Sequence, residues 1–172
     1  MADIIRVYTQ DAGSLRFIGK KYGDEDRVNG MFGAKWGEWF ENGWFETLEG
    51  HIGNPADTCE DGGAYIGLMR DKHGEPFQYW IGIFASAGTE TPEDFECVDF
   101  PGAKFGICWL YGKEDGIYMN EHLCFERLKE EGIDGINDGN GACWFFERYA
   151  SPRFTEPDDK DNIILDIGFF VK

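Results

Sequence analysis

The sequence has few of the side chains that build metal and redox sites. Its three histidines, His51, His73 and His122, are far apart, and none belongs to an HExxH motif. The cysteines are odd in number, widely spaced and without a CxxC pair, so neither a zinc ribbon nor a disulfide framework is indicated. They are Cys59, Cys97, Cys108, Cys124 and Cys143. We therefore expect no metal, no cofactor and a reducing, cytoplasmic environment.

Long apolar runs and familiar catalytic motifs are also absent. No stretch reaches the roughly eighteen apolar residues of a membrane-spanning helix, and the first residues carry charge where a signal peptide would be apolar. The sequence contains no GxSxG, no SxxK, no P-loop GxxxxGKS/T and no GxGxxG that opens a helix. We expect a soluble protein that makes no contact with membranes and has none of these common sites.

Positive charge is scarce. Lysine and arginine number 16 against 33 aspartates and glutamates, which gives a formal net charge of -17. The phosphate backbone of a nucleic acid would be repelled, and no basic amphipathic helix is available to read a DNA groove, so we expect no direct binding of nucleic acid. The same acidic field would attract cations toward a cleft, because low-dielectric walls concentrate field lines.

Aromatic residues, by contrast, are abundant. They make up 16% of the 172 residues, with six Trp, seven Tyr and fifteen Phe. Trp and Tyr carry polar atoms that need partners when they are buried. This content therefore fits either a cavity lined by rings or a β-rich core built from large side chains. A chain of this length can form one domain that buries roughly 70% of the surface of its unfolded state.

The chain contains an internal repeat. At an offset of 89, residues 11–26 match residues 100–115 without a gap at six of sixteen positions. The identical pairs are Gly13/Gly102, Ile18/Ile107, Tyr22/Tyr111, Gly23/Gly112, Glu25/Glu114 and Asp26/Asp115. Shorter matches in the same order are WFE (39–41) with CFE (124–126) and WIGIF (80–84) with DIGFF (166–170). We infer a single domain, 1–172, whose halves, about 1–88 and 95–172, are related by pseudo-twofold symmetry and each run strand, helix, strand, strand.

Local patterns predict the elements of each half. The repeated first segments should be strands that end at the turns 22–24 and 111–113. The other strands are expected at 64–70, 77–85, 142–150 and 162–171. A helix over 31–48 would carry Trp36, Trp39 and Phe40 on one stripe, unless Asn42-Gly43 interrupts it. A second helix would begin after Asn120 as N-cap, carry the stripe Cys124, Phe125 and Leu128, and stop at Gly132.

The segment WFFERYASP (144–152) places one carboxylate among four aromatic residues. In a strand over 142–149, one face carries Phe145, Glu147 and Tyr149, and the opposite face carries the alternate residues. A carboxylate between rings on a covered face must regain its lost hydration through hydrogen bonds, a cation or protonation. Two interpretations are open: Glu147 forms the polar floor of a ligand pocket, or it faces water at a sheet edge and pairs with an arginine.

Four segments carry a resemblance to a known family. They are FQYWIGI (77–83), DFPGAKFGI (99–107), FFERYASP (145–152) with its Glu-x-Tyr, and ILDIGFFV (164–171). In this order the chain resembles, over nearly its whole length, the GyrI-like family. That family includes the effector-binding domain of BmrR- and AraC-type multidrug regulators, the gyrase-inhibitory protein and stand-alone integron-encoded proteins.

The resemblance implies an α+β fold. Tandem strand-helix-strand-strand modules would form one antiparallel sheet with two helices on one side and a central cleft. In the family, aromatic residues line the cleft, and an acid of the Glu-x-Tyr strand contacts lipophilic cations. The matching acid is Glu147, with Tyr149 beside it. Further ligand-binding residues are assigned from aromatic type and expected position, and they are Trp36, Trp39, Tyr79, Trp80, Trp109 and Phe145.

Three functions remain in view. The first is a stand-alone protein that binds aromatic, lipophilic or cationic small molecules, since the chain departs from the regulators in lacking a DNA-binding segment. The second is a hydrolase of strained, cyclopropane-type electrophiles, in which Glu147 would be the acid and base and Tyr149 would orient it. Such chemistry calls for a second acid, which no motif supplies. The third is a protein-interaction module like the gyrase inhibitor, with the acidic loops 86–94 and 155–161 as its surface.

Overall fold

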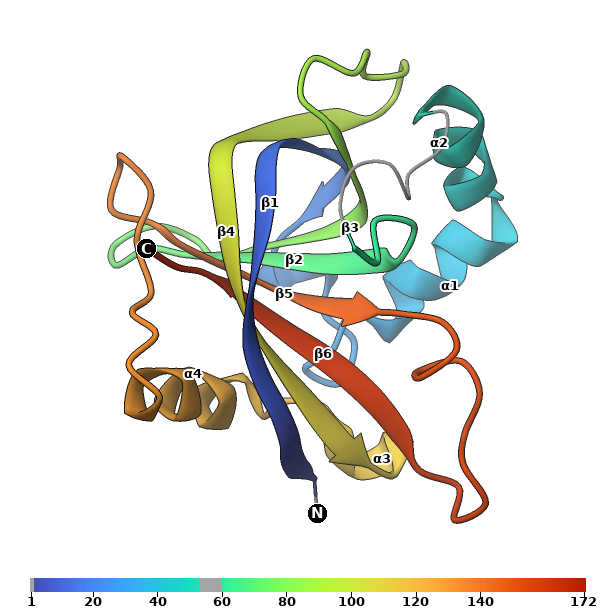
Figure 1. Ribbon diagram of the computed structural model, residues 1–172. Coiled ribbons are helices and arrows are strands. Elements are labelled where there is room, and N and C mark those ends of the chain that lie inside the picture. Colours follow the sequence, from blue (N-terminus) through green and yellow to red (C-terminus); the bar gives the residue numbers. More distant parts are fainter. Residues whose placement is uncertain (1, 53–59) are drawn as a thin grey trace.

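The chain forms one antiparallel sheet together with helices. The computed structural model describes residues 2–52 and 60–172, and in these residues the fold is α+β with six strands (Figure 1). The strands are β1 (Asp3–Tyr22), β2 (Tyr65–Asp71), β3 (Gln78–Ser86), β4 (Glu96–Gly112), β5 (Cys143–Tyr149) and β6 (Ile163–Phe170). All four strands expected outside the repeated first segments are confirmed to within one residue at each end. Cys59 lies outside the described residues, and the other four cysteines are free thiols.

The order of the strands shows the symmetry expected from the repeat. The sheet runs β1-β3-β2-β5-β6-β4 and closes on itself because β1 and β4 also pair. Exchanging β1 with β4, β2 with β5 and β3 with β6 leaves this order unchanged. The repeated glycines Gly13 and Gly102 have positive φ angles of 65° and 62°, and the β1–β4 ladder shifts register around Gly13. The repeat therefore preserves a backbone conformation that favours glycine.

The first half carries two helices where one was expected. Helix α1 (Gly33–Glu41) and helix α2 (Trp44–Ile52) are separated at Asn42-Gly43, and Gly43 has a φ of 65°. A residue in the left-handed region ends a right-handed helix, so the interruption considered from the sequence is present. A short helix also follows each repeated strand at the Gly-containing turn: η1 (Asp24–Asp26) after β1 and α3 (Glu114–Ile117) after β4.

The second expected helix is α4 (Glu121–Glu130). Its end is confirmed at Gly132, where the backbone N–H of Ile133 donates to the carbonyl of Leu128 at 2.9 Å and that of Gly132 to Lys129 at 3.0 Å. Asn120 occupies the N-cap position, but its side chain does not cap α4. Its amide instead donates to the carbonyls of residues 116–118, which fixes the turn between α3 and α4.

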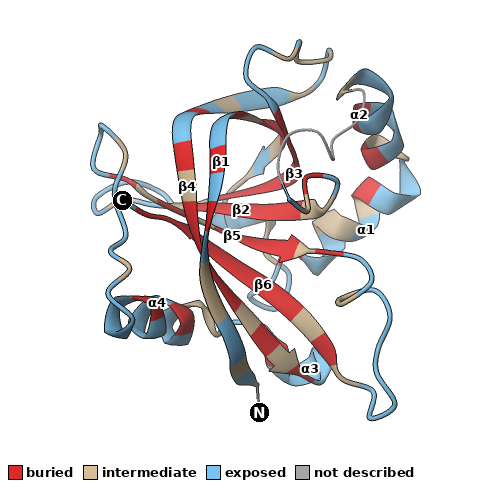
Figure 2. Cartoon of the chain, in the orientation of Figure 1, coloured by how far each residue is buried: buried red, intermediate tan, exposed pale blue. Residues whose placement is uncertain are grey.

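The interior of the closed sheet is filled by large aromatic side chains. Phe84, Phe105 and Phe146 meet there with ring centroids 4.8 to 5.6 Å apart. Strands β2, β3, β5 and β6 are buried along most of their length, whereas β1 and β4 have long exposed or half-buried parts and the helices show exposed outer surfaces (Figure 2). Gly168 makes room for this packing, because a Cβ atom on it would lie 2.2 Å from the ring of Phe146.

The helices cover two separate parts of the outer face of the sheet. Under α1 and α2, Trp39, Phe45 and Leu48 contact outward-facing residues of β3. Under α3 and α4, Cys124 and Leu128 contact residues of β4 and β6. The outer face of β5 lies between these two layers.

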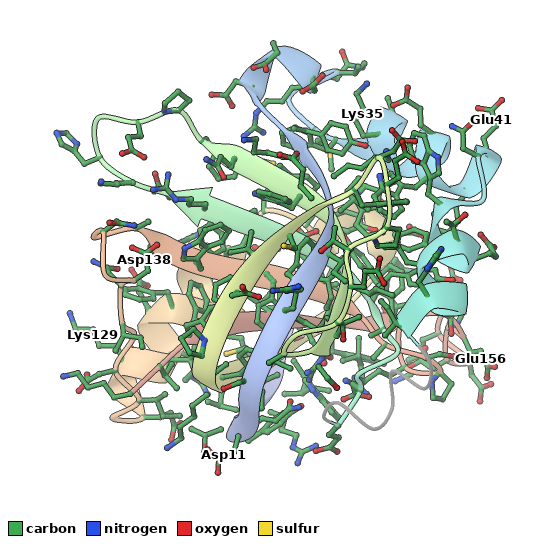
Figure 3. All side chains as sticks on the ribbon, turned by 90° about the horizontal axis from the view of Figure 1, so that it is seen from above. Asp11, Lys35, Glu41, Lys129, Asp138 and Glu156 are labelled. Carbon is green, nitrogen blue, oxygen red and sulfur yellow. The ribbon has the colours of Figure 1, made fainter. Side chains whose placement is uncertain are left out.

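Most charged side chains lie on the outside of the molecule, and Glu147, Arg148 and Asp166 are buried. Figure 3 shows Lys35, Glu41, Lys129 and Glu156 at its periphery. Across residues 2–52 and 60–172, every helix is too short or too polar to cross a bilayer.

Candidate functional site

A cavity of about 640 Å³ opens between the two groups of helices. Its floor is formed by outward-facing residues of β2, β3 and β5. One wall comes from α1 and the turn before it, and the other from α3, the start of α4 and the turn between them. The floor residues are Met69, Tyr79, Phe145, Glu147 and Tyr149. The cavity thus lies where the two halves of the chain meet.

Glu147 lies at the centre of the floor. Strand β5 is flanked by β2 and β6, and Glu147 is opposite Gly67 in the register with β2. Its side chain is only 7% exposed, so it does not face water at a sheet edge. Gly67 keeps the floor open, because a Cβ atom there would lie 2.5 Å from the Tyr79 hydroxyl and 3.3 Å from the Glu147 carboxylate.

Two tyrosines bind the carboxylate of Glu147. The hydroxyl of Tyr149 donates a short hydrogen bond to Oε2, and the hydroxyl of Tyr79 donates to the same oxygen at 3.4 Å. The indole N–H of Trp36 in turn donates to the Tyr79 hydroxyl at 3.0 Å. Burial raises the pKa of both tyrosines well above the ordinary value. Both therefore keep their protons and act as donors to Glu147.

The surroundings of Glu147 favour its protonated form. Burial raises its pKa from 4.5 to about 7, against the opposing effect of the hydrogen bond from Tyr149. A neighbouring carboxylate, Glu121 at the first position of α4, raises the pKa of Glu147 further through its charge and through a hydrogen bond between the two carboxyl groups. Sequence reasoning missed Glu121, because an acid in the first turn of a helix is ordinary there.

Rings and thioethers enclose the space above the carboxylates. Phe32, before α1, stacks on Tyr79 with centroids 4.2 Å apart and an interplanar angle of 4°. Trp36 meets Tyr149 edge-on at 4.8 Å. At the mouth, Met31 from one half and Met119 from the other are 42% and 66% exposed. A cavity lined in this way favours apolar, aromatic and positively charged guests.

The structure brings five of the eight predicted ligand-binding residues together in this cavity. They are Glu147, Tyr149, Trp36, Tyr79 and Phe145. Trp39 and Trp80 lie elsewhere. Trp39 is fully buried and donates to the hydroxyl of Tyr22 at 2.9 Å. Trp80 follows Tyr79 in β3 and therefore points to the opposite face, into the interior, edge-on to Phe17 at 6.1 Å.

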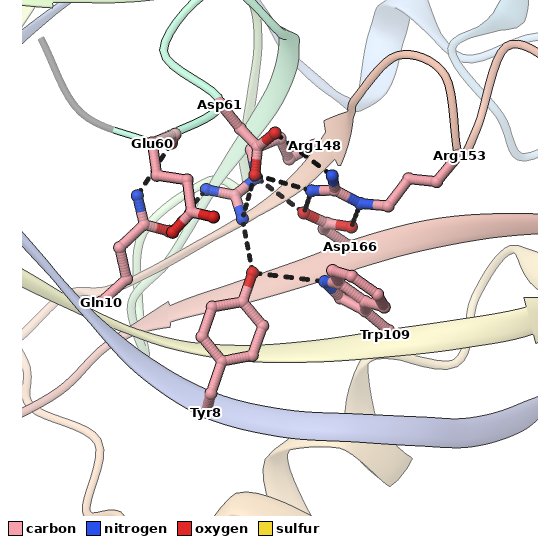
Figure 4. A network of polar contacts seen from close by, with 8 residues as sticks. All are labelled: Tyr8, Gln10, Glu60, Asp61, Trp109, Arg148, Arg153 and Asp166. Carbon is pink, nitrogen blue, oxygen red and sulfur yellow. Dashed lines mark hydrogen bonds and ion pairs between the residues drawn. The ribbon is translucent and has the colours of Figure 1, made fainter.

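Trp109, the third predicted indole outside the cavity, lies on β4, opposite Arg6 of β1 and Asp166 of β6. Its N–H donates to the hydroxyl of Tyr8 at 3.2 Å (Figure 4). The guanidinium groups of Arg6 and Arg153 each lie 4.7 Å from its ring centroid. This ring already holds two cations of the protein and is not available as a wall of the cavity.

A buried ion-pair network underlies β5 on the face opposite Glu147 (Figure 4). Arg148 is 2% exposed and donates from Nε to Asp166, which has no exposed surface, at 2.7 Å. Arg153 also contacts Asp166, donating from Nε at 2.8 Å, and binds Asp61 at 2.8 Å. Two arginines and two aspartates leave this network without net charge. Because it fixes β5 from within, it holds Glu147 in position on the outer face.

The carboxylates of the cavity have no cationic partner within the described parts of the chain. Glu114, Glu121 and Glu147 form none of the ion pairs found there, and the nearby Arg27 is paired with Asp24 at 2.8 Å. In residues 2–52 and 60–172, no three His, Cys, Asp or Glu side chains are grouped to hold a metal ion. The arrangement can therefore accept positive charge from a guest, or move a proton between neighbouring carboxyl groups.

The comparisons with known proteins identify the fold. No protein-family model matches the sequence, and no curated protein matches it. SAV2435, solved with tetraphenylphosphonium bound, aligns with a TM-score of 0.67 at 14% identity, over 98% of this chain and 94% of its own. EcmrR, in a complex with DNA, aligns with a TM-score of 0.57 at 11% identity, over 97% of this chain and 57% of its own.

A third similar structure is an integron cassette protein of Vibrio cholerae. It aligns with a TM-score of 0.51 at 10% identity, over 99% of both chains. Identities this low establish the fold alone. The chain shares the fold of these three structures, in agreement with the resemblance to the GyrI-like family that its sequence carries.

Proposed function

We propose that this protein binds lipophilic aromatic cations in the cavity, with the positive charge of the ligand close to Glu147. The observation that carries the proposal is a carboxylate, 7% exposed, at the floor of a 640 Å³ cavity lined by rings, with no arginine or lysine partner in the described residues. A buried acid without a cation is costly, so a cationic ligand gains by supplying the missing charge. SAV2435, which shares the fold, has been solved with such a cation bound.

The energetics favour broad specificity. A cation over a well-placed ring gains roughly 0.5 to 2 kcal/mol, and the burial of apolar surface adds about 25 cal/mol per Å². Neither interaction demands one ligand shape, whereas the carboxylate selects the sign of the charge. The exposed methionines at the mouth, Met31 and Met119, are adaptable side chains suited to ligands of different outline.

Titration with tetraphenylphosphonium tests the proposal, with calorimetry and tryptophan fluorescence as the two readouts. Triphenylphosphine oxide is the neutral counterpart. We expect Glu147→Gln to weaken binding of the phosphonium by about tenfold or more, which is about 1.4 kcal/mol, and to leave the neutral compound little affected. Trp36→Ala should weaken both, since it removes a ring from the wall.

The control variant is Glu41→Gln, because Glu41 is exposed on α1 and lies outside the cavity lining. It should bind as the unaltered chain does. The proposal fails if the phosphonium shows no binding up to the limit of its solubility. It also fails if Glu147→Gln and Glu41→Gln bind the phosphonium equally well.

Hydrolysis of strained electrophiles is the second candidate. The observation that favours it is Glu121, which supplies beside Glu147 the second acid that no motif provided. A carboxyl with a pKa of about 7 is suited to both taking up and releasing a proton near neutral pH. Turnover of a cyclopropane-bearing electrophile, abolished by Glu147→Gln while binding of a stable analogue persists, would support an enzyme. Binding without turnover would support the binding function and not the enzyme.

A further inference from the structure

The two oxygens of the Glu147 carboxylate have different surroundings. The hydroxyls of Tyr79 and Tyr149 both donate to Oε2. The same oxygen lies on the side of Gly67, because a Cβ atom built on that glycine would be 3.3 Å from it. Oε2 is therefore turned toward β2 and β3 in the floor of the cavity, and two phenols already occupy it as an acceptor.

Oε1 is the oxygen that remains available to a guest. Both hydrogen bonds that residues 2–52 and 60–172 donate to the ionised carboxylate end on Oε2. In these residues the hydroxyl of Thr91 is the one fully buried side-chain polar atom without a partner, so Oε1 is not sealed inside the protein. Since Glu147 lines the cavity and keeps 7% of its surface exposed, Oε1 faces the cavity. It needs a donor there, because an unsatisfied acceptor in a covered site is costly.

The polar side chains nearby do not supply this donor. Glu114 and Glu121 line the opposite wall, and ionised carboxylates offer acceptors only. Arg27 is paired with Asp24 at 2.8 Å. The indole N–H of Trp36 donates to a phenol hydroxyl at 3.0 Å. Water or a ligand must therefore donate to Oε1.

Cations with and without an N–H bond meet this oxygen differently. An N–H group can replace water at Oε1 with a charge-assisted hydrogen bond of about 2.8 Å, which also brings the positive charge close to the carboxylate. A quaternary ammonium or phosphonium ion displaces the same water and presents only C–H groups. It leaves the oxygen without a strong donor, and its own alkyl or aryl groups keep the charge further away.

We infer that the cavity prefers protonated amines over quaternary cations of the same ring system and charge, and that Oε1 of Glu147 is the acceptor that distinguishes them. One N–H bond is enough, because Oε2 is already occupied by Tyr79 and Tyr149. Quaternary cations such as tetraphenylphosphonium still bind, through their charge and their contacts with rings, but without this hydrogen bond. The inference rests on the proposed function and adds a chemical class of ligand to it.

Calorimetry with two naphthalene derivatives tests the inference. Dimethyl(naphthylmethyl)ammonium has one N–H bond, and trimethyl(naphthylmethyl)ammonium has a methyl group in its place. At about pH 8 both ligands carry one positive charge, and this pH is above the pKa of Glu147, which is about 7. We expect the amine to bind roughly tenfold more tightly, although it has one methyl group fewer to bury.

Glu147→Gln should lower the ratio of the two affinities to about one. The two phenols would hold the amide oxygen as they hold Oε2, so the amide NH2 group would take the place of Oε1 and could not accept a hydrogen bond. Tyr149→Phe should retain the preference for the amine, because it removes a donor to Oε2 and leaves Oε1 in place. If a phenol oxygen were the acceptor instead, this variant would lose the preference. Glu41→Gln, outside the cavity lining, should bind both ligands as the unaltered chain does.

Three results overturn the inference and leave the binding function intact. They are equal binding of the two ligands by the unaltered chain, a preference that persists in Glu147→Gln, and a preference that is lost in Tyr149→Phe. The inference is also overturned if tetraphenylphosphonium binds and the amine does not, since the N–H bond would then add no affinity. Failure of all three cations to bind overturns the binding function together with the inference.

Discussion

At Glu147 the needs of folding and of binding are opposed. The residue sits at the floor of the cavity with 7% of its surface exposed, and its hydration is replaced by the hydroxyls of Tyr79 and Tyr149. A carboxylate that lacks water and lacks a cation destabilises the folded state when it is ionised. A cationic ligand would supply the positive charge that this carboxylate lacks. The protein therefore carries a cost in stability at the position where we expect it to gain affinity.

The pH dependence of unfolding should report this cost. Because the pKa of Glu147 is about 7 in the folded chain and 4.5 as its ordinary value, the folded state holds an extra proton between these pH values. The free energy of unfolding therefore falls as pH rises through this window, by up to the order of 3 kcal/mol above it. Glu147→Gln carries no charge, so in urea unfolding it should match the unaltered chain near about pH 5 and be the more stable near about pH 8.

Glu41→Gln, exposed on α1, is the control for this measurement and should show no such pH dependence relative to the unaltered chain. A difference between Glu147→Gln and the unaltered chain that stays constant from about pH 5 to about pH 8 would mean that the folded state does not hold the proton.

At the same scale, the strand alternation in 144–152 predicted which residues share a face with Glu147. It placed Phe145 and Tyr149 correctly beside it, because the side-chain period of a strand is two. The sequence could not distinguish Trp36, which lines the cavity, from Trp39 of the same helix, which is buried against the aromatic residues around it, since both faces of α1 are covered in part. Glu121 could not be predicted, because its place in the cavity lining depends on how α4 packs on β4 and β6 beside β5, and no local pattern encodes that packing.

At the scale of elements, repeated glycines set how closely the strands approach. Gly82 and Gly168 match in the repeat, and each occupies a place where a side chain would not fit. A Cβ on Gly82 would lie 2.1 Å from the carbonyl oxygen of Ile18 and 2.7 Å from the Cα of Gly19, the residue opposite it in β1. Both obstacles are backbone atoms, so no rotamer change removes them.

Gly82→Ala should therefore destabilise the chain by roughly 3 kcal/mol or more, beyond the usual cost of overpacking, because β1 and β3 must separate. The matched control is Gly50→Ala in α2, where an added Cβ meets nothing within 4 Å. There, the lower entropy of the unfolded chain and the better helix propensity should stabilise the fold by about 0.5 to 1 kcal/mol. Urea midpoints of the two variants give the comparison, and similar midpoints would show that the strands do not approach so closely.

The repeat and the strand patterns predicted most of the architecture. Every strand outside the repeated segments was placed to within one residue, since alternation and turn residues are local signals. The division of 31–48 into α1 and α2 was left open, because Gly43 is compatible with a helix interior as well as with a left-handed turn. How the sheet closes on itself depends on β1 pairing with β4, which is a contact between the halves that no local pattern encodes.

At the scale of the whole molecule, the net charge of -17 should act on the rate at which ligands arrive. Acidic side chains such as Glu41 and Glu156 lie at the periphery, so the field extends into the solvent. Lysines and arginines pair with several of these acids, and the excess remains negative. Such a field concentrates cations near the protein and is screened by salt over about 10 Å at 0.1 M ionic strength.

Stopped-flow measurement of tryptophan quenching by tetraphenylphosphonium should therefore show an association rate that falls several-fold between about 0.01 M and about 0.5 M salt. The dissociation rate should change much less, because the contact between the ligand and Glu147 is buried and is poorly screened. Triphenylphosphine oxide, which has no net charge, should associate at a rate that salt leaves nearly constant. If both ligands slow equally, or if salt acts on dissociation alone, the long-range field does not guide cations to the cavity, and the local carboxylates alone must account for any preference for positive charge.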